Sequence, residues 1–220
     1  MTIEALSPAR IRQLIIAGWT GRDRVAQEKH IAELELLGVT RPAATPVYYR
    51  AAAARLTTAE SIEVTGNDSS GEVEFVVLRM DGSLWIAVGS DHTDRKVETY
   101  NITVSKQMCD KPVSRNMWLL DDLVDHWDSL VLRSWRVMAG VRHLYQEGSV
   151  STMLHPQELI AGYAKKGGGL LEEGSAMFGG TLAAHGGIQP ADRFEFELED
   201  SVLKRRLTHG YDVRVLPNAG

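Results

Sequence analysis

Three acidic residues stand where two neighbouring segments of high β-propensity come to their ends. Glu72 and Glu74 open the run that continues to Met80, and Asp91 follows the apolar run 84–88 after two small residues. A strand directs residues i and i+2 to the same face. Both faces of this strand are largely apolar, so we expect it to be covered on both sides. The pattern places Glu72, Glu74 and Val76 on one face and Val73, Phe75 and Val77 on the other.

Paired carboxylates in such a place repel each other and lose hydration. They either take up a proton or neutralise their charge on a cation. A hard divalent cation with oxygen ligands, Mg²⁺ or Ca²⁺, is the natural partner. Asp91 can supply the third carboxylate of such a site. A Glu-x-Glu pair on a strand more commonly just faces water, and this alternative stays open on the spacing alone.

The order of several motifs along the chain resembles the fumarylacetoacetate hydrolase superfamily. That superfamily carries Glu-x-Glu on one strand, then an Asn-Asp-x-Ser/Thr-x-Arg-Asp segment, a Lys-x-x-Asp segment, a Gln-x-Gly-x-x-x-x-Met segment, a Gly-Thr pair and a Pro-Gly-Asp. The matching residues here are Glu72-Val73-Glu74, Ser90–Lys96 with Asp91, Thr93 and Arg95 in register, Ser105–Asp110, Gln146–Met153, Gly180-Thr181 and Pro190-Ala191-Asp192.

The resemblance implies a role for each of these positions. Glu72, Glu74 and Asp91 would bind Mg²⁺, or Mn²⁺ or Ca²⁺ in its place. Lys106 would be a catalytic cation that stabilises an enolate oxygen or polarises a carbonyl. Substrate-binding residues would be Arg50, Arg95, Gln146 and Thr181. The resemblance also implies a homodimer.

A predicted helix over residues 23–37 carries a candidate general base. His30 and Glu33 are three residues apart and share one side of that helix. A His–Glu pair can activate a water molecule, and some members of the superfamily use such a pair on an N-terminal helix. A solvated helix face is at least as good an interpretation. The histidine that the superfamily carries near this point has no counterpart, because Arg24 stands there.

The implied function is a metal-dependent hydrolase that cleaves a C–C bond in a small acylpyruvate or 1,3-dicarbonyl acid through a metal-bound enolate. The same scaffold supports a 2-oxo acid hydratase, decarboxylase or isomerase, and the missing histidine keeps these alternatives open. A second alternative is a non-catalytic ligand-binding protein. Retention of Lys106 argues against it, because a binding protein would not need this lysine.

Composition excludes several other classes of protein. The 220 residues are 44% hydrophobic and 24% charged, which is ordinary for one globular domain. A net charge of −5 without a basic cluster argues against nucleic-acid binding. A single cysteine, Cys109, suits a reducing compartment. Because we see neither a signal peptide nor an apolar run of membrane-spanning length, we expect a cytoplasmic protein without membrane contact.

Many short strands with glycine-rich connections predict a β-rich α+β fold. The resemblance implies a rolled mixed β-sandwich, with residues 1–45 as a helical region at the site mouth and residues 46–220 as the catalytic roll. Pro8 predicts a helix start over residues 8–16, and the spacing over 116–138 predicts a helix. The run 98–104 is strand-like, residues 156–165 should be helical, and strands are expected at 47–50, 61–64 and 193–199 and near 176 and 211–215.

Overall fold

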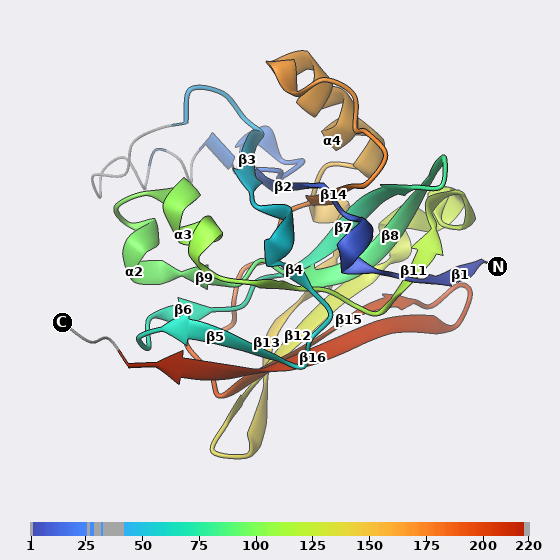
Figure 1. The fold of residues 1–220 in the computed structure, drawn as a ribbon. Coiled ribbons are helices and arrows are strands. Elements are labelled where there is room, and N and C mark those ends of the chain that lie inside the picture. The colour runs from blue at the N-terminus through green and yellow to red at the C-terminus, as the bar shows by residue number, and fades with distance from the viewer. Residues whose placement is uncertain (1, 26, 29–31, 33–41, 218–220) are drawn as a thin grey trace.

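The computed structural model describes residues 2–25, 27–28, 32 and 42–217, and two stacked β-sheets dominate it (Figure 1). The larger sheet has the strand order β1-β11-β8-β7-β14-β2-β3. Its strands are β1 (Ile3–Ala5), β11 (Asn116–Leu119), β8 (Ser83–Ser90), β7 (Val73–Met80), β14 (Ser175–Phe178), β2 (Gln13–Gly18) and β3 (Val47–Ala51). The second sheet runs β13 (Val141–Ser149), β12 (Val131–Met138), β15 (Arg193–Asp200), β16 (Arg205–Leu216) and β5 (Ser61–Thr65).

Two short strand pairs and a few helices complete the described chain. The pairs are β10 (Lys111–Pro112) with β4 (Leu56–Thr57), and β6 (Ser69–Ser70) with β9 (Thr93–Asp94). The α-helices are α2 (Arg95–Glu98), α3 (Ile102–Met108) and α4 (Pro156–Tyr163), and a π-helical turn, η6 (Ala164–Gly168), follows α4. Single 3-10 segments are η1 (Pro8–Arg10), η2 (Ala53–Arg55), η3 (Leu120–Asp122), η4 (Val124–Ser129) and η5 (Val150–Thr152).

Strand β7 is buried on both faces, as its sequence predicts. Val73, Phe75 and Val77 pack into the core between the two sheets. Val76 and Leu78 belong to a second apolar cluster on the opposite face of the larger sheet. Glu74 shares that second face, because it alternates with these residues. The predicted β-rich α+β fold is confirmed.

A tight hairpin sets the register of β7 against β8. Asp81 and Gly82 form its turn with φ angles of 53° and 74°, the backbone geometry of a type I′ turn. The turn pairs Glu74 with Gly89 across the ladder. Asp91 follows the end of β8, and its backbone N–H donates to the Glu72 carbonyl oxygen at 2.9 Å. The hairpin therefore brings all three carboxylates to one end of the strand pair.

Three predicted elements were wrong. Residues 8–16 form the 3-10 turn η1 and the start of β2, since Leu14 to Ile16 are buried in the larger sheet. The run 98–104 contains the last residue of α2, a turn and the start of α3, because Asp94 and Asn101 cap the two helices by accepting hydrogen bonds from the backbone of Val97 and Val104. Residues 116–138 form β11, two 3-10 segments and β12.

The predicted N-terminal helical region, residues 1–45, contains β-strands where the structure describes it. Residues 3–5 and 13–18, which were expected in a helical region, are strands of the larger sheet. Most of the predicted helix 23–37 lies outside the described residues. The predicted helix near 156–165 and the strands near 47–50, 61–64, 176, 193–199 and 211–215 are present as α4, β3, β5, β14, β15 and β16.

Candidate metal centre

Glu72, Glu74 and Asp91 meet at the end of the β7–β8 hairpin. Each offers a carboxylate oxygen, and these atoms all lie within 4.8 Å of one another. Asp91 is fully buried and Glu74 is 3% exposed, while Glu72 is half-buried. Among the described residues, they form a group with the spacing that a single bound metal ion requires. The three carboxylates that the sequence analysis singled out therefore lie together, and their role as metal ligands remains a prediction.

Two lysines converge on the same aspartate. Lys106, from α3, makes a short contact with Asp91 Oδ2, and its Nζ lies 3.9 Å from Glu72 Oε2. Lys111, from β10, lies 3.1 Å from Asp91 Oδ1 and donates to the His92 carbonyl oxygen at 2.5 Å. Both lysine side chains are buried. The sequence reasoning missed Lys111, whose only signal was its nearness to Lys106 in the chain.

Arg95 connects the outer edge of the cluster. Its Nη2 lies 3.2 Å from Glu72 Oε1, and its Nη1 donates to Glu98 Oε2 at 2.8 Å. Its Nε donates to Ser70 Oγ at 2.7 Å. The guanidinium of Arg95 therefore links Glu72 to Glu98 and to Ser70.

The charges of the cluster shift one another's pKa values in opposite directions. Burial raises the pKa of Glu74 well above its usual range, and the charges of Asp91 and Glu72 raise it further. Burial would also raise the pKa of Asp91, but Lys106 and Lys111 lower it to about 2. For Lys106, burial would lower the pKa, and the charges of Asp91, Glu72 and Glu98 outweigh burial and raise it.

The cluster suits a divalent cation. When all its groups are ionised, four carboxylates (Glu72, Glu74, Asp91 and Glu98) face three cationic side chains (Arg95, Lys106 and Lys111), which leaves excess negative charge. Asp91 Oδ1 is buried and lacks a well-directed hydrogen bond, although it has its ion pair with Lys111. A fixed set of buried carboxylate oxygens is the donor set that Mg²⁺, Mn²⁺ or Ca²⁺ prefers. The residues present therefore fit the group that the sequence implies.

The Gly180-Thr181 pair contacts β7 at Glu74 and Val73. The Gly180 N–H donates to Glu74 Oε2 at 2.7 Å. Only glycine fits there, because φ is +104° and a Cβ would lie 1.9 Å from Thr20 Oγ1. The Thr181 hydroxyl donates to the Val73 carbonyl oxygen at 2.8 Å.

Gln146 uses its side-chain amide within the protein. Its Oε1 accepts from the Val73 N–H and the Ser134 hydroxyl, both at 2.9 Å. Its Nε2 donates to Thr181 Oγ1 at 2.9 Å and to the Leu182 carbonyl oxygen at 2.6 Å. These partners join β7 to the Gly180–Leu182 segment. The described contacts therefore place Gln146 as a support for that segment.

The other sequence-derived candidates are placed less directly. Arg50 is exposed on β3, where its Nη1 lies 3.4 Å from the Tyr163 hydroxyl. His30 and Glu33 lie outside the described residues. The sequence reasoning also missed His92, which is fully buried between the Tyr211 and Ser69 hydroxyls at 2.9 Å each. Burial, together with Lys111 and Arg95, lowers the pKa of His92 to about 3, so this histidine is neutral.

In the part of the chain that the structure describes, no helix combines the length and apolar character needed to cross a membrane.

Solved structures with this fold include enzymes of 2-oxo acids. A 2-keto-3-deoxy-D-arabinonate dehydratase complexed with magnesium and 2,5-dioxopentanoate matches with a TM-score of 0.65 and 18% identity, over 95% of this chain and 75% of that chain. A 4-oxalocrotonate decarboxylase from Pseudomonas putida G7, complexed with calcium and acetate, matches with a TM-score of 0.59 and 14% identity, over 92% and 76%. Cg1458 with inhibitor matches with a TM-score of 0.67 and 16% identity, over 94% and 78%.

At these identities the likeness shows the shared fold. Among curated proteins, no sequence matches the chain significantly. A family model described as "Protein of unknown function (DUF2848)" matches residues 17–211. Because this match covers most of the 220 residues, the chain belongs to the DUF2848 family.

Proposed function

We propose that this protein is a divalent-metal-dependent enzyme of small 2-oxo or 1,3-dicarbonyl acids and a divergent branch of the fumarylacetoacetate hydrolase superfamily. One observation carries the proposal. The carboxylate oxygens of Glu72, Glu74 and Asp91 lie close together, and the buried Lys106 forms an ion pair with the buried Asp91 of this group. The dehydratase with magnesium and the decarboxylase with calcium support it, since both share the fold.

Glu72, Glu74 and Asp91 would hold the cation, which supplies Lewis-acid chemistry to a bound carbonyl or carboxylate when present. Lys106 lies beside Asp91, Glu72 and Glu98, and their negative charges keep its ammonium group protonated. A protonated lysine in this position stabilises negative charge that develops on a neighbouring substrate oxygen. Its role is therefore electrostatic, and the proton acceptor of the reaction must be another group.

The reaction that we propose first is hydrolysis of a C–C bond in an acylpyruvate. It requires a base that activates water, and His30 with Glu33 remain the predicted pair for that role. Arg50, Arg95 and Thr181 remain predicted substrate contacts. Gln146 would act on the substrate only through Thr181 and the Gly180–Leu182 segment, because its own amide is occupied.

Dehydration or decarboxylation of a 2-oxo acid is the second candidate. The dehydratase and decarboxylase that share the fold favour it. Both reactions need stabilisation of an enolate-like charge, which Lys106 can provide, and neither needs an activated water molecule. A non-catalytic ligand-binding protein is the third alternative. Assembly as a homodimer remains a prediction, which light scattering of the purified protein would test.

Calorimetric titration tests the metal centre. Mg²⁺ and Mn²⁺ are titrated into the wild-type protein and into Glu72→Ala, with and without oxalate, which mimics an enolate held by two oxygens. We expect metal-dependent oxalate binding that Glu72→Ala abolishes. Absence of metal binding to the wild-type protein would overturn the proposal.

Turnover assays then separate the reactions. The Mg²⁺-loaded protein is incubated with acylpyruvates, with 4-hydroxy-2-oxo acids that can lose water, and with oxaloacetate that can lose carbon dioxide, and products are identified by chromatography. Cleavage of an acylpyruvate that disappears in His30→Gln supports hydrolysis. Conversion of the other acids that survives His30→Gln supports the second candidate. Oxalate binding without turnover of any of these acids, with Lys106→Met unchanged in binding, would favour the non-catalytic alternative.

A further inference from the structure

A cavity of about 760 Å³ lies beside the candidate metal centre. It is bounded by the end of β2, by β3 and the segment before it, by the first residue of α3, and by the end of α4 with η6. The described residues that line it are Trp19, Pro42, Ala43, Ala44, Val47, Tyr48, Tyr49, Arg50, Ile102, Tyr163, Lys166, Gly167 and Gly168.

Helix α3 links this cavity to the metal centre. Ile102 lines the cavity, and Lys106, one helical turn later, contacts Asp91. Residues i and i+4 share one side of a helix. The Tyr49 ring also lines the cavity, and its centroid lies 6.0 Å from Lys106 Nζ. Glu72, Glu74 and Asp91 do not line the cavity, so it adjoins the metal centre and does not contain it.

The walls of the cavity are aromatic and held in place by close packing. The rings of Tyr48 and Tyr163 meet edge to face with centroids 5.3 Å apart. A Cβ on Gly162 would lie 2.4 Å from the Tyr48 hydroxyl, and one on Gly168 would lie 2.3 Å from the Tyr163 ring. The Tyr48 hydroxyl also donates to the Leu159 carbonyl oxygen at 2.8 Å. A preformed aromatic wall of this kind favours a planar apolar ligand.

The charges at the rim have one sign. Arg50 and Lys166 are exposed lining residues, and the described lining contains no aspartate or glutamate. Arg50 has a long contact with the Tyr163 hydroxyl at 3.4 Å, and Lys166 donates to the Pro46 carbonyl oxygen. In a chain with a net charge of −5, a rim of this kind attracts a negative group.

We infer that this cavity receives the side chain of the 2-oxo acid, and that the side chain is a planar apolar group with an acidic outer end. This inference rests on the proposed function, because the metal centre would hold the 2-oxo acid end. The head would then lie beside Lys106 and the side chain would extend past Tyr49 toward Arg50. The substrate would be an aromatic acyl acid in preference to a short-chain one.

Oxamates test the inference without turnover, because they keep the two-oxygen head of oxalate and have no carbon that can form an enolate. N-methyloxamate, N-phenyloxamate and N-(4-carboxyphenyl)oxamate are titrated calorimetrically into the Mg²⁺-loaded protein. We expect the phenyl compound to bind about tenfold more tightly than the methyl compound, from burial and ring contacts. We expect the carboxyl group to add about two- to fivefold, from an exposed ion pair.

Variants assign these gains to the cavity. Ala44→Trp fills the cavity from its exposed side. It should abolish the tighter binding of N-phenyloxamate over N-methyloxamate (the phenyl gain), while oxalate and N-methyloxamate bind as before. Ile102→Trp fills it from α3 and provides a second variant. Ala54→Trp, at an exposed alanine of η2 outside the lining, is the matched control and should keep the gain. Arg50→Met should remove only the carboxyl gain.

The outcomes separate the two claims. Oxalate binding with equal affinities for the methyl and phenyl compounds would overturn this inference and leave the proposed function standing. A phenyl gain that persists in both tryptophan variants would also overturn it, because the ring would then bind elsewhere. No oxalate binding to the Mg²⁺-loaded protein would overturn the proposed function and this inference together.

Discussion

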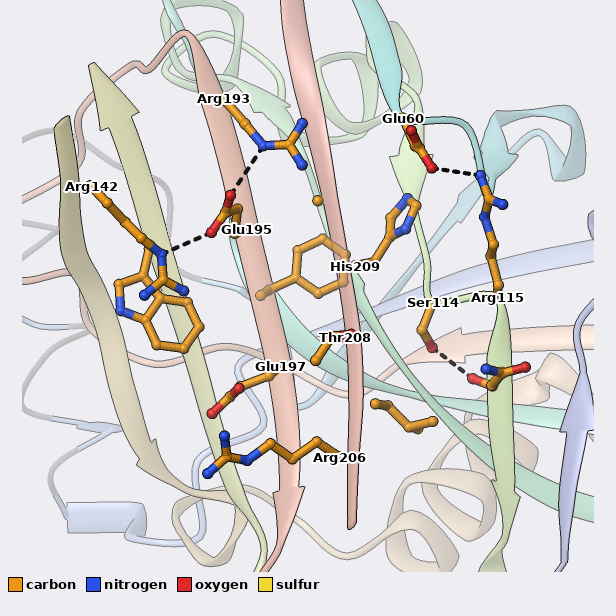
Figure 2. Close-up of a pocket in the computed structure, with 15 residues that line it drawn as sticks. Glu60, Ser114, Arg115, Arg142, Arg193, Glu195, Glu197, Arg206, Thr208 and His209 are labelled. Carbon is orange, nitrogen blue, oxygen red and sulfur yellow. Dashed lines mark hydrogen bonds and ion pairs between the residues drawn. The ribbon is translucent and has the colours of Figure 1, made fainter. Parts of the chain in front are cut away.

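The metal centre and the outer face of the five-stranded sheet are built from the same residue types in different surroundings. On the outer face, Arg193 pairs with Glu195 at 3.2 Å and with Asp212 at 2.8 Å, and Arg142 pairs with Glu195 at 2.8 Å. Figure 2 shows Arg142, Glu195 and Arg193 along one side of a groove of about 620 Å³, with Glu60 and Arg115 paired at its other edge. On this face, each of the acidic side chains named here is paired with an arginine.

Burial is what distinguishes the two regions. Asp212 and Arg142 are about half exposed, so water stabilises their charges and each ion pair contributes little. Asp91, Lys106 and Lys111 are almost completely buried, and Glu74 has no cationic partner within ion-pair distance among the described contacts. A buried charge is costly unless it is paired or binds a cation. This difference in burial favours the inner cluster as the candidate metal centre over the outer face.

The largest effect is expected at the shared aspartate. Asp91→Asn leaves Lys106 and Lys111 buried without their common carboxylate, and should lower the free energy of unfolding of the metal-free protein by about 3–5 kcal/mol. Denaturant unfolding measures this change. Asp212→Asn, the same substitution on the outer face, is the control and should cost less than about 1 kcal/mol. Equal costs at the two positions would break the comparison.

The opposite sign is expected for Glu74. Its buried carboxylate is raised in pKa by burial and by its two acidic neighbours, so Glu74→Gln removes an unfavourable charge and keeps an acceptor for the Gly180 N–H. The metal-free variant should unfold about 2–4 °C higher for each kcal/mol gained. Thermal unfolding without and with Mg²⁺ measures both effects, and we expect Mg²⁺ to stabilise only the wild-type protein. A variant that is destabilised without metal and still stabilised by Mg²⁺ would contradict the assignment.

A smaller effect is expected at Arg133, the best-connected arginine of the outer face. It pairs with Glu147 at 2.5 Å, with Glu197 at 2.9 Å and with Glu199. Because Arg133, Glu147 and Glu199 are partly exposed, Arg133→Met should cost about 1 kcal/mol, and salt should reduce that cost. Unfolding in low and high salt tests this expectation. If Arg133→Met lowered the free energy of unfolding as much as Asp91→Asn does, and salt did not change this effect, the ion pairs of the outer face would stabilise the fold as strongly as the buried ones.

The smallest effect is a pH dependence at His209, which lines the outer groove. Burial lowers its pKa below the usual 6.5, and its Nε2 lies 3.0 Å from the Ala59 carbonyl oxygen. A histidine with a depressed folded-state pKa contributes stability above its unfolded pKa, and this contribution is lost as the pH falls below about 6.5. Unfolding free energies of wild type and His209→Gln between pH 8 and 5 should differ in slope below pH 6.5. If the unfolding free energies of the two proteins changed in parallel with pH, the lowered pKa of His209 would be contradicted.

Local sequence determined much of the fold and one half of the candidate site. Alternation over residues 72–80 indicated a strand buried on both faces, and it placed Glu72 and Glu74 on one side. Local sequence gave the wrong prediction where β-propensity and helix-capping residues favoured different structures. The run 98–104 was predicted to be strand-like, but its residues 102–104 begin α3, which Asn101 caps and which packs against β3 and β9.

Only the tertiary structure decided which charges are buried together. The parallel pairing of β10 with β4 carries Lys111 to Asp91, and α3 brings Lys106 to the other oxygen of that carboxylate. The cavity walls come from segments as distant as Trp19 and Lys166. Sequence periodicity reports which face of a strand a side chain takes, because that depends on neighbouring residues. Loss of hydration and long-range ion pairing depend on the packed chain, so no local pattern encodes them.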